Sequence, residues 1–119
     1  QTLHAAGADV QYVSIPSNGR WYDHIGIKKD RREAVYKKIH STVVDNGGKI
    51  YDLTNKDYEK YVISDAVHIG WKGWVYVDQQ IARHMDGHAP KNHEVDYSKN
   101  KPPHKHHNDR QDDQHQGNK

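Results

Sequence analysis

Asp9-Val-Gln-Tyr-Val-Ser-Ile15 is rich in β-branched and aromatic residues and stops at Pro16, and it therefore predicts a β-strand. A second short strand is predicted at Lys49-Ile-Tyr-Asp-Leu53. Between the two, residues 28–46 have helical periodicity, with Asp30 as the candidate N-cap and a Gly-Gly pair after the last turn. Two strands separated by a helix of this length predict a right-handed parallel crossover.

The rest of the chain predicts loops and a second long helix. Residues 16–26 are expected to form an aromatic-rich loop, residues 55–61 a short turn or helix, residues 62–70 another loop and residues 71–85 the helix. Each long helix has an apolar stripe that is expected to face the core. These stripes are Val35, Tyr36, Ile39, Thr42 and Val43 in the first helix, and Trp71, Trp74, Val75, Ile81, Ala82 and Met85 in the second.

The order of these elements indicates the α/β class. A parallel sheet needs helices on both faces and more than two strands, so two strands are not expected to form a stable sheet alone. We interpret residues 1–85 as the C-terminal βαβα portion of a larger parallel-sheet domain, incomplete on its own. The stretch from Leu3 to Gly7 resembles the last turn of a helix with its glycine stop, so the chain is expected to begin inside a domain.

The composition changes at residue 86. Hydrophobic residues make up 33% of the 119 residues and charged residues 29%, but residues 86–119 hold few large apolar side chains. Such a segment cannot bury enough apolar surface to offset its ordering entropy, and we expect a disordered, His-rich polar tail there. Within it, His104, His106 and His107 are spaced for weak binding of a transition metal, although such tracts are usually only solvated. We assign no metal site and no cofactor.

The charge pattern argues against nucleic-acid binding. The net charge is +2, and cationic side chains are interleaved with anionic ones, so no basic face stands out. The chain has no Cys, which excludes disulfides and thiolate metal sites. It has no signal peptide and no apolar run long enough for a transmembrane helix.

Asp65 and His68 are the candidate catalytic residues. A carboxylate three residues before a histidine, in a tight loop that leads into a helix, puts both side chains on one side of the turn. The carboxylate can then bond to one ring nitrogen and leave the other free to take a proton from a nucleophile. A serine needs such a base because its hydroxyl is a weak acid. The bare pattern also occurs by chance, as a local hydrogen bond in a loop.

Two segments resemble motifs of the DltD family. Asp65-Ala-Val-His-Ile-Gly-Trp-Lys-Gly-Trp74 resembles the D-x-x-H-[LI]-G-W-K-G-W segment near the C-terminus of these proteins. Ile15-Pro-Ser-Asn-Gly-Arg-Trp-Tyr-Asp23 resembles their P-x-N-G-[KR]-W-x-D loop. The resemblance covers residues 3–85, and the tail is unmatched.

The resemblance implies a three-layer α/β domain similar to SGNH-type hydrolases, with Ser, Asp and His as catalytic residues. His68 would be the general base and Asp65 its orienting partner, whereas the serine would lie outside this chain, which alone is expected to be inactive. The family acts in the D-alanine esterification of lipoteichoic and wall teichoic acids. The resemblance also implies a membrane anchor in an N-terminal segment absent here and a position on the extracytoplasmic face of the membrane. The expected partners are teichoic acid, a D-alanyl donor and other membrane proteins of the D-alanylation machinery.

Several alternatives remain open. Asn18, Trp21 and Tyr22 are candidate substrate-binding residues, but a simple turn and ordinary packing would explain the first two equally well. An SGNH-like esterase or thioesterase that releases D-alanyl groups would use the same triad as a transfer enzyme. A non-catalytic binding module that faces the cell wall is the third possibility.

Overall fold

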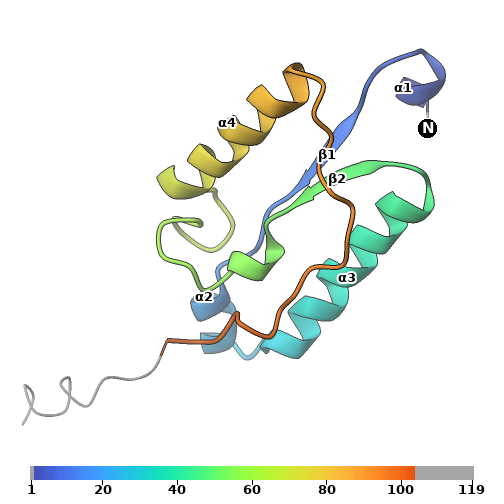
Figure 1. Ribbon diagram of the computed structural model, residues 1–119. Coiled ribbons are helices and arrows are strands. Elements are labelled where there is room, and N and C mark those ends of the chain that lie inside the picture. Colours follow the sequence, from blue (N-terminus) through green and yellow to red (C-terminus); the bar gives the residue numbers. More distant parts are fainter. Residues whose placement is uncertain (1, 104–119) are drawn as a thin grey trace, which may run out of the picture.

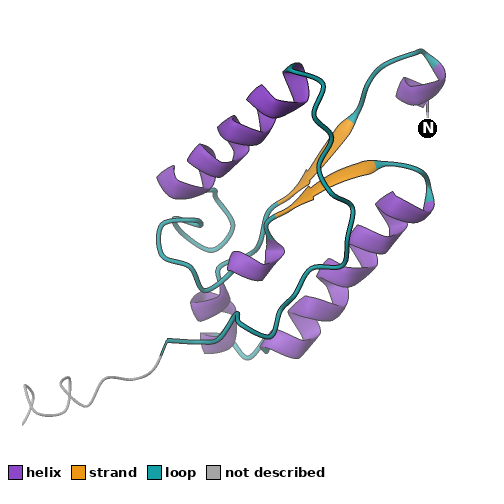
Figure 2. Ribbon diagram, in the orientation of Figure 1, coloured by secondary structure: helices purple, strands orange, loops and turns teal. Residues whose placement is uncertain are grey.

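The computed structural model describes residues 2–103, which form an arrangement of helices around two strands (Figure 1; Figure 2). The elements are α1 (Thr2–Ala5), β1 (Gln11–Ser14), α2 (Gly19–His24), α3 (Lys29–Asp45), β2 (Lys49–Asp52), the 3-10 helix η1 (Thr54–Lys56) and α4 (Trp71–Met85). In Figure 1, α3 lies on one side of the two strands and α4 on the other.

β1 and β2 form a two-stranded parallel sheet, in register from Gln11 opposite Lys49 to Ser14 opposite Asp52. The predicted parallel pair and the α/β class are confirmed, and both strands are shorter than the apolar runs that predicted them. Because the strands are parallel, their carboxyl ends meet at one edge of the sheet, where sites of α/β proteins usually lie.

A small apolar core surrounds β2 and the segment after it. Ile50, Leu53 and Val62 are almost completely buried, and Tyr36 of α3 is buried as well. Burying one such side chain stabilises a fold by about 1.5–3 kcal/mol. The core therefore fixes α3 and the residues that follow β2 in one unit.

Both long helices expose apolar side chains that were predicted to be buried. On α3 the buried residues are Arg32 and Tyr36, whereas Val35 is 57% exposed. On α4 the buried residues include Val77, while Trp71 and Met85 are exposed, as are the other large residues of the predicted stripe. The helical spacing is confirmed, but the expected burial of the stripes is wrong: within residues 2–103 Tyr36 is the one buried stripe residue of α3, and no stripe residue of α4 is buried. No helix within residues 2–103 has the length and apolar character needed to cross a membrane.

Two local predictions near α3 are wrong. The N-cap of α3 is Lys28, without a side-chain hydrogen bond, and the carboxylate of Asp30 accepts a hydrogen bond inside the first turn instead. The loop predicted at residues 16–26 contains the short helix α2, because the side chain of Asn18 accepts hydrogen bonds from the first free amides of that helix.

Residues 86–103, here called the strap, have no helix or strand of their own beyond the end of α4, but they run along the domain (Figure 1). The side chain of Asn92 accepts a hydrogen bond from the amide of Ile50 at 2.9 Å and donates one to the carbonyl of Gly48 at 2.7 Å. Asn92 thus forms hydrogen bonds with backbone groups at the outer edge of β2, where a neighbouring strand would otherwise pair. The expected disorder does not describe this part of the tail, and residues 104–119, with His104, His106 and His107, lie outside the described residues.

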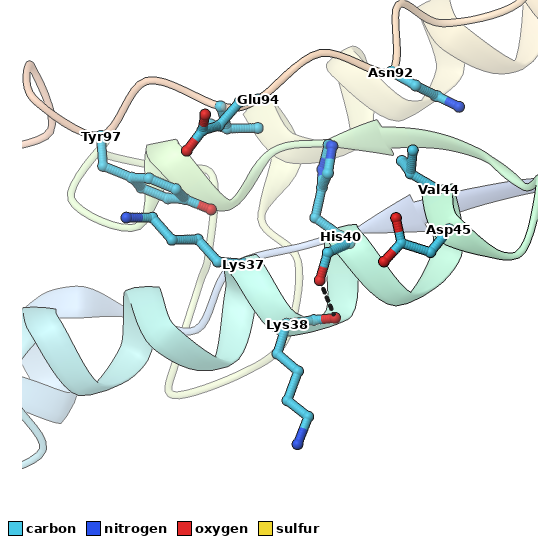
Figure 3. A pocket seen from close by; sticks show the side chains of 10 residues that line it. Lys37, Lys38, His40, Val44, Asp45, Asn92, Glu94 and Tyr97 are labelled. Carbon is cyan, nitrogen blue, oxygen red and sulfur yellow. Dashed lines mark hydrogen bonds between the residues drawn. The ribbon is translucent and has the colours of Figure 1, made fainter.

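Two further anchors hold the strap. Tyr97 is buried and its ring stacks on Tyr36, with 6.4 Å between ring centroids. Asn100 is also buried and donates a hydrogen bond to Asp57. Between α3 and the strap lies a cavity of about 500 Å³, bordered by His40 and Tyr97 (Figure 3). The strap is therefore fixed by a few specific contacts rather than by continuous apolar packing, which is why its low apolar content did not predict its order.

Candidate active site

Asp65 and His68 are in direct contact, in the loop between η1 and α4. Asp65 Oδ2 lies 2.6 Å from His68 Nδ1. Asp65 Oδ1 accepts hydrogen bonds from the backbone amides of Val67 and His68, each at 2.9 Å. One carboxylate therefore forms the turn with one oxygen and holds the imidazole with the other, which explains the three-residue spacing.

The charge of Asp65 favours one tautomer of the neutral His68 ring. The amides of His68 and Val67, followed by the His68 ring, lower the pKa of Asp65 to about 2, so this carboxylate is ionised at neutral pH. An ionised carboxylate beside Nδ1 favours the tautomer with its proton on Nδ1, which leaves a lone pair on Nε2. The side chain of His68 is 78% exposed, so Nε2 is open to a reacting group.

Glycines allow the loop to close tightly against the start of α4. Ser64 N donates to the carbonyl of His68 at 2.8 Å, and Gly70 N donates to the carbonyl of Val62 at 2.7 Å. A Cβ on Gly70 would lie 2.3 Å from the carbonyl oxygen of Tyr61, and a Cβ on Gly73 would lie 2.4 Å from that of Val62. The two glycines of the Gly-Trp-Lys-Gly-Trp stretch thus permit a close backbone approach that no other residue allows.

Asn18 joins this loop to the carboxyl end of β1. Its Nδ2 donates to the carbonyl oxygen of Asp65 at 2.8 Å, and its backbone amide donates to the carbonyl of Ala66 at 2.9 Å. Trp21 is exposed and Tyr22 is half-buried, and no hydrogen bond among the described residues links either to Asp65 or His68. The structure therefore brings only Asn18, of the three candidate substrate-binding residues, into polar contact with the Asp65 loop.

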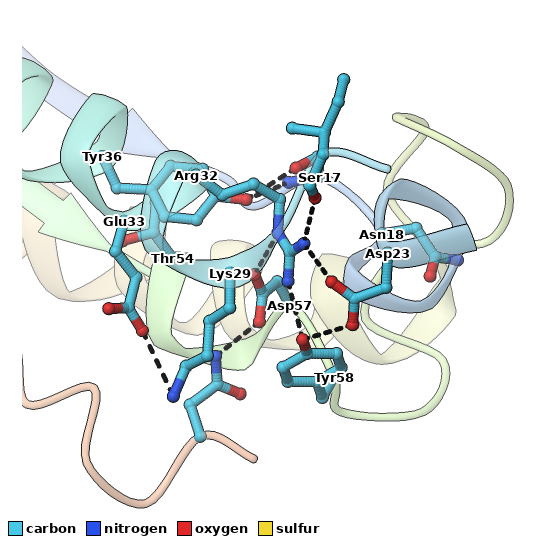
Figure 4. Close-up of polar contacts among 12 residues, drawn as sticks. Ser17, Asn18, Asp23, Lys29, Arg32, Glu33, Tyr36, Thr54, Asp57 and Tyr58 are labelled. Atoms are coloured by element: carbon cyan, nitrogen blue, oxygen red, sulfur yellow. Dashed lines mark hydrogen bonds and ion pairs between the residues drawn. The ribbon is translucent and has the colours of Figure 1, made fainter. Parts of the chain in front are cut away.

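A buried cluster around Arg32 supports the neighbouring helix α2 (Figure 4). The guanidinium donates to Asp23 at 2.7 Å, to Asp57 at 3.1 Å and to Tyr58 at 2.9 Å. Burial disfavours its charge, but the hydrogen bonds with Asp23, Tyr58 and Asp57 outweigh burial and raise the pKa of Arg32. The apolar stripe predicted for this helix does not include Arg32, and only its pairing with distant carboxylates reveals its role.

A second His–Asp pair was also missed. His40 Nδ1 lies 2.7 Å from Asp52 Oδ2, where it joins α3 to the end of β2. Asp52 also accepts hydrogen bonds from the amide and hydroxyl of Thr54. The two residues are 12 positions apart in the sequence, so no local motif signals them. No group of three or more His, Asp or Glu side chains suited to a metal ion occurs within residues 2–103.

The chain is similar to proteins of one family. The model of the family described as DltD protein matches residues 1–86. Over 100 residues, which are 84% of this chain and 25% of the relative, the chain is 79% identical to Protein DltD of Staphylococcus aureus. It is 44% identical to Protein DltD of Bacillus subtilis over 79 residues, 66% of this chain and 20% of that protein. It is 27% identical to Protein DltD of Lacticaseibacillus rhamnosus over 74 residues, 61% of this chain and 18% of that protein.

The chain spans about a quarter or less of the length of these relatives. A match that covers 100 residues of the chain cannot end before residue 100, so the similarity to the S. aureus protein includes most of the strap. The expectation that everything after residue 85 is unmatched is therefore wrong. The family match includes the Asp65–His68 loop and Asn18, and the chain belongs to the DltD family.

Proposed function

We propose that this chain supplies the general base, His68, and its orienting carboxylate, Asp65, for a serine-type acyl transfer in the D-alanylation of lipoteichoic and wall teichoic acids. The observation that carries the proposal is the 2.6 Å contact between Asp65 and His68 Nδ1 in an exposed loop. The loop lies beside the carboxyl end of a parallel strand, inside the region that matches the DltD family. An exposed ion pair adds little to stability, so stability alone gives no reason for this arrangement.

The proposed reaction has two steps and uses one nitrogen for the proton in both. The serine oxygen attacks the carbonyl carbon of a D-alanyl donor while His68 Nε2 takes the hydroxyl proton, and the leaving group of the donor receives that proton. A teichoic acid hydroxyl then attacks the D-alanyl-serine ester and gives its proton to Nε2, from which the departing serine oxygen recovers it. Asp65 stays ionised throughout and stabilises the imidazolium.

The serine belongs to chain outside these 119 residues, in a larger three-layer domain of the SGNH-hydrolase type. The shape of the sheet supports this proposal. The strap occupies the outer edge of β2 through Asn92, whereas the other edge of β1 has no strand beside it within residues 2–103. Tyr12 and Val13 of β1 are also partly exposed, so a further strand along β1 would cover apolar surface. A loop at the carboxyl end of such a strand would face His68.

The proposed setting follows from the same function. As the sequence resemblance implies, the whole protein would act on the extracytoplasmic face of the membrane. It would be anchored by an N-terminal segment and work with the other membrane proteins of the D-alanylation machinery.

The test uses the S. aureus relative as a carrier, because its aligned segment is 79% identical to this chain. That segment is replaced by the matching residues of this chain, and the chimera is expressed in a strain that lacks its own DltD. His68→Gln is expected to slow the incorporation of labelled D-alanine into teichoic acid by about a hundredfold or more, because general-base catalysis contributes about 10²–10⁴ in rate. His24→Gln, at an exposed histidine of α2, is the matched control and is expected to have no effect.

The outcomes separate the competing functions. Undiminished incorporation by His68→Gln, at equal protein level, would refute the proposal and leave a binding module as the explanation. Release of free D-alanine without transfer to the polymer by the unsubstituted chimera would favour an esterase or thioesterase.

A further inference from the structure

We propose that Asn18 is a positioning residue, which fixes the Asp65–His68 loop against the carboxyl end of β1, and not a residue that binds substrate. The catalytic meaning of this inference rests on the proposed function of His68. The contacts that support it do not depend on that function, because they are made within the protein itself.

Both ends of the Asn18 side-chain amide are already engaged. The Nδ2 group donates to the carbonyl oxygen of Asp65 at 2.8 Å. The Oδ1 atom accepts from the backbone amides of Arg20 at 3.2 Å and Trp21 at 3.4 Å, and so caps α2. The backbone amide of Asn18 adds a third link, to the carbonyl of Ala66 at 2.9 Å. Asn18 therefore joins two structures and has little capacity left for a ligand.

The loop tip depends on these links. Within the described residues, the hydrogen bonds that join residues 64–68 to anything outside the loop 61–70 all come from Asn18. The tip itself is mostly exposed, so apolar packing does not replace them. The carbonyl that Asn18 holds belongs to Asp65, the residue whose carboxylate orients His68. A shift of this backbone therefore moves the carboxylate and the imidazole together.

The other side of Asn18 rests on a rigid base. Gly19 N donates to the carbonyl of Asp57 at 2.7 Å, and a Cβ on Gly19 would meet the ring of Tyr58 at 2.8 Å. At the far end of α2, Asp23 accepts hydrogen bonds from the buried Arg32 at 2.7 Å and from the Tyr58 hydroxyl. Figure 4 shows Asn18 beside this cluster. The buried cluster therefore holds α2 in place, and Asn18 at the start of α2 holds the loop tip.

The experiment separates the donor from the cap. Asn18→Ser and Asn18→Asp both keep a good N-cap for α2, but neither can donate to the Asp65 carbonyl as the amide does. One is neutral and the other charged, so a shared effect does not come from charge. Ser17→Ala is the matched control. Ser17 is next to Asn18 in the sequence, but its side chain bonds to Tyr36 of α3 at 2.6 Å and not to the loop.

The readout is the tautomer of His68, measured in the chimera at neutral pH by long-range ¹H–¹⁵N correlation spectra after selective labelling of histidine. The unsubstituted chain and Ser17→Ala are expected to hold the proton mainly on Nδ1. Both Asn18 variants are expected to shift toward the Nε2–H form that free imidazole side chains prefer. In the chimera, Asn18→Ser is expected to slow D-alanine transfer by about ten- to a hundredfold, since small displacements of a catalytic group cost up to about 10² in rate.

Two results would overturn the inference. One is an unchanged His68 tautomer in both Asn18 variants, as expected if Asn18 only contacted substrate. The other is loss of amide dispersion across α3 and β2 in both variants, which would make Asn18 a determinant of the whole fold. A changed tautomer together with normal transfer by His68→Gln would instead keep the positioning role and reject the proposed function.

Discussion

Replacing Arg32 with Met is expected to lower the free energy of unfolding by about 3–5 kcal/mol, the usual cost of breaking one side of a buried ion pair. Arg32 is 4% exposed and Asp57 is 3% exposed, so the substitution leaves a buried carboxylate whose only side-chain donor within residues 2–103 is Asn100. The contact with Asp23 contributes less, because Asp23 is partly exposed. Native domains have about 5–15 kcal/mol of stability in total, so the loss is large.

The assay is urea unfolding followed by tryptophan fluorescence, in a double-mutant cycle with Asp57→Asn. The double variant is expected to lose less stability than the sum of the single variants, by about 1 kcal/mol or more, because an amide leaves no unpaired charge. A cost below about 1 kcal/mol for Arg32→Met, or strict additivity in the cycle, would show that the charge pairing with Asp57 does not hold this region together.

The site loop gives two further predictions. The carboxyl ¹³C signal of Asp65 is expected to titrate with a midpoint at about 2 rather than at the ordinary pKa of 3.8. Because folding lowers this pKa, the ionised Asp65 stabilises the folded state above the ordinary pKa, and this stabilisation is lost as the pH falls through about 2. A midpoint near the ordinary value would contradict the turn geometry. Helix propensity alone would make Gly73→Ala stabilise α4 by about 1 kcal/mol. The added Cβ would lie 2.4 Å from the Val62 carbonyl oxygen, so the substitution is instead expected to lower the free energy of unfolding by about 1–3 kcal/mol, as measured by thermal unfolding. Gln79→Ala, at an exposed position of the same helix, is expected to stay within about 0.5 kcal/mol, and a raised melting temperature for Gly73→Ala would refute the crowding argument.

Local patterns were sufficient to predict the strands and long helices of this protein. A β-branched run ending at Pro16 and helical spacing after residue 28 are properties of short segments, and both were confirmed. Which face of a helix is buried depends on what lies next to it. Trp74 and Val35 belong to the predicted stripes, yet both are exposed among the described residues, and α4 buries Val77 instead.

The site shows the same division between local and distant information. Asp65 and His68 are close in sequence, and their contact could be predicted from one turn of backbone. The contact of Asn18 with the same loop could not, because Asp65 is 47 residues away in the sequence. The buried position of Arg32 was equally hidden, since a charged residue is buried only when distant partners pair with it.

The two His–Asp pairs show why exposure matters more than geometry in locating a site. Nδ1 lies 2.7 Å from the carboxylate in His40–Asp52 and 2.6 Å in His68–Asp65. The side chain of Asp52 is 3% exposed and is also bonded by Thr54, so this pair joins α3 to β2 and stabilises the fold. The other pair lies on a loop tip in solvent, where an ion pair contributes little to stability. Its tight turn, its glycines and its link to Asn18 hold the imidazole of His68 toward solvent, as the proposed role of a general base requires.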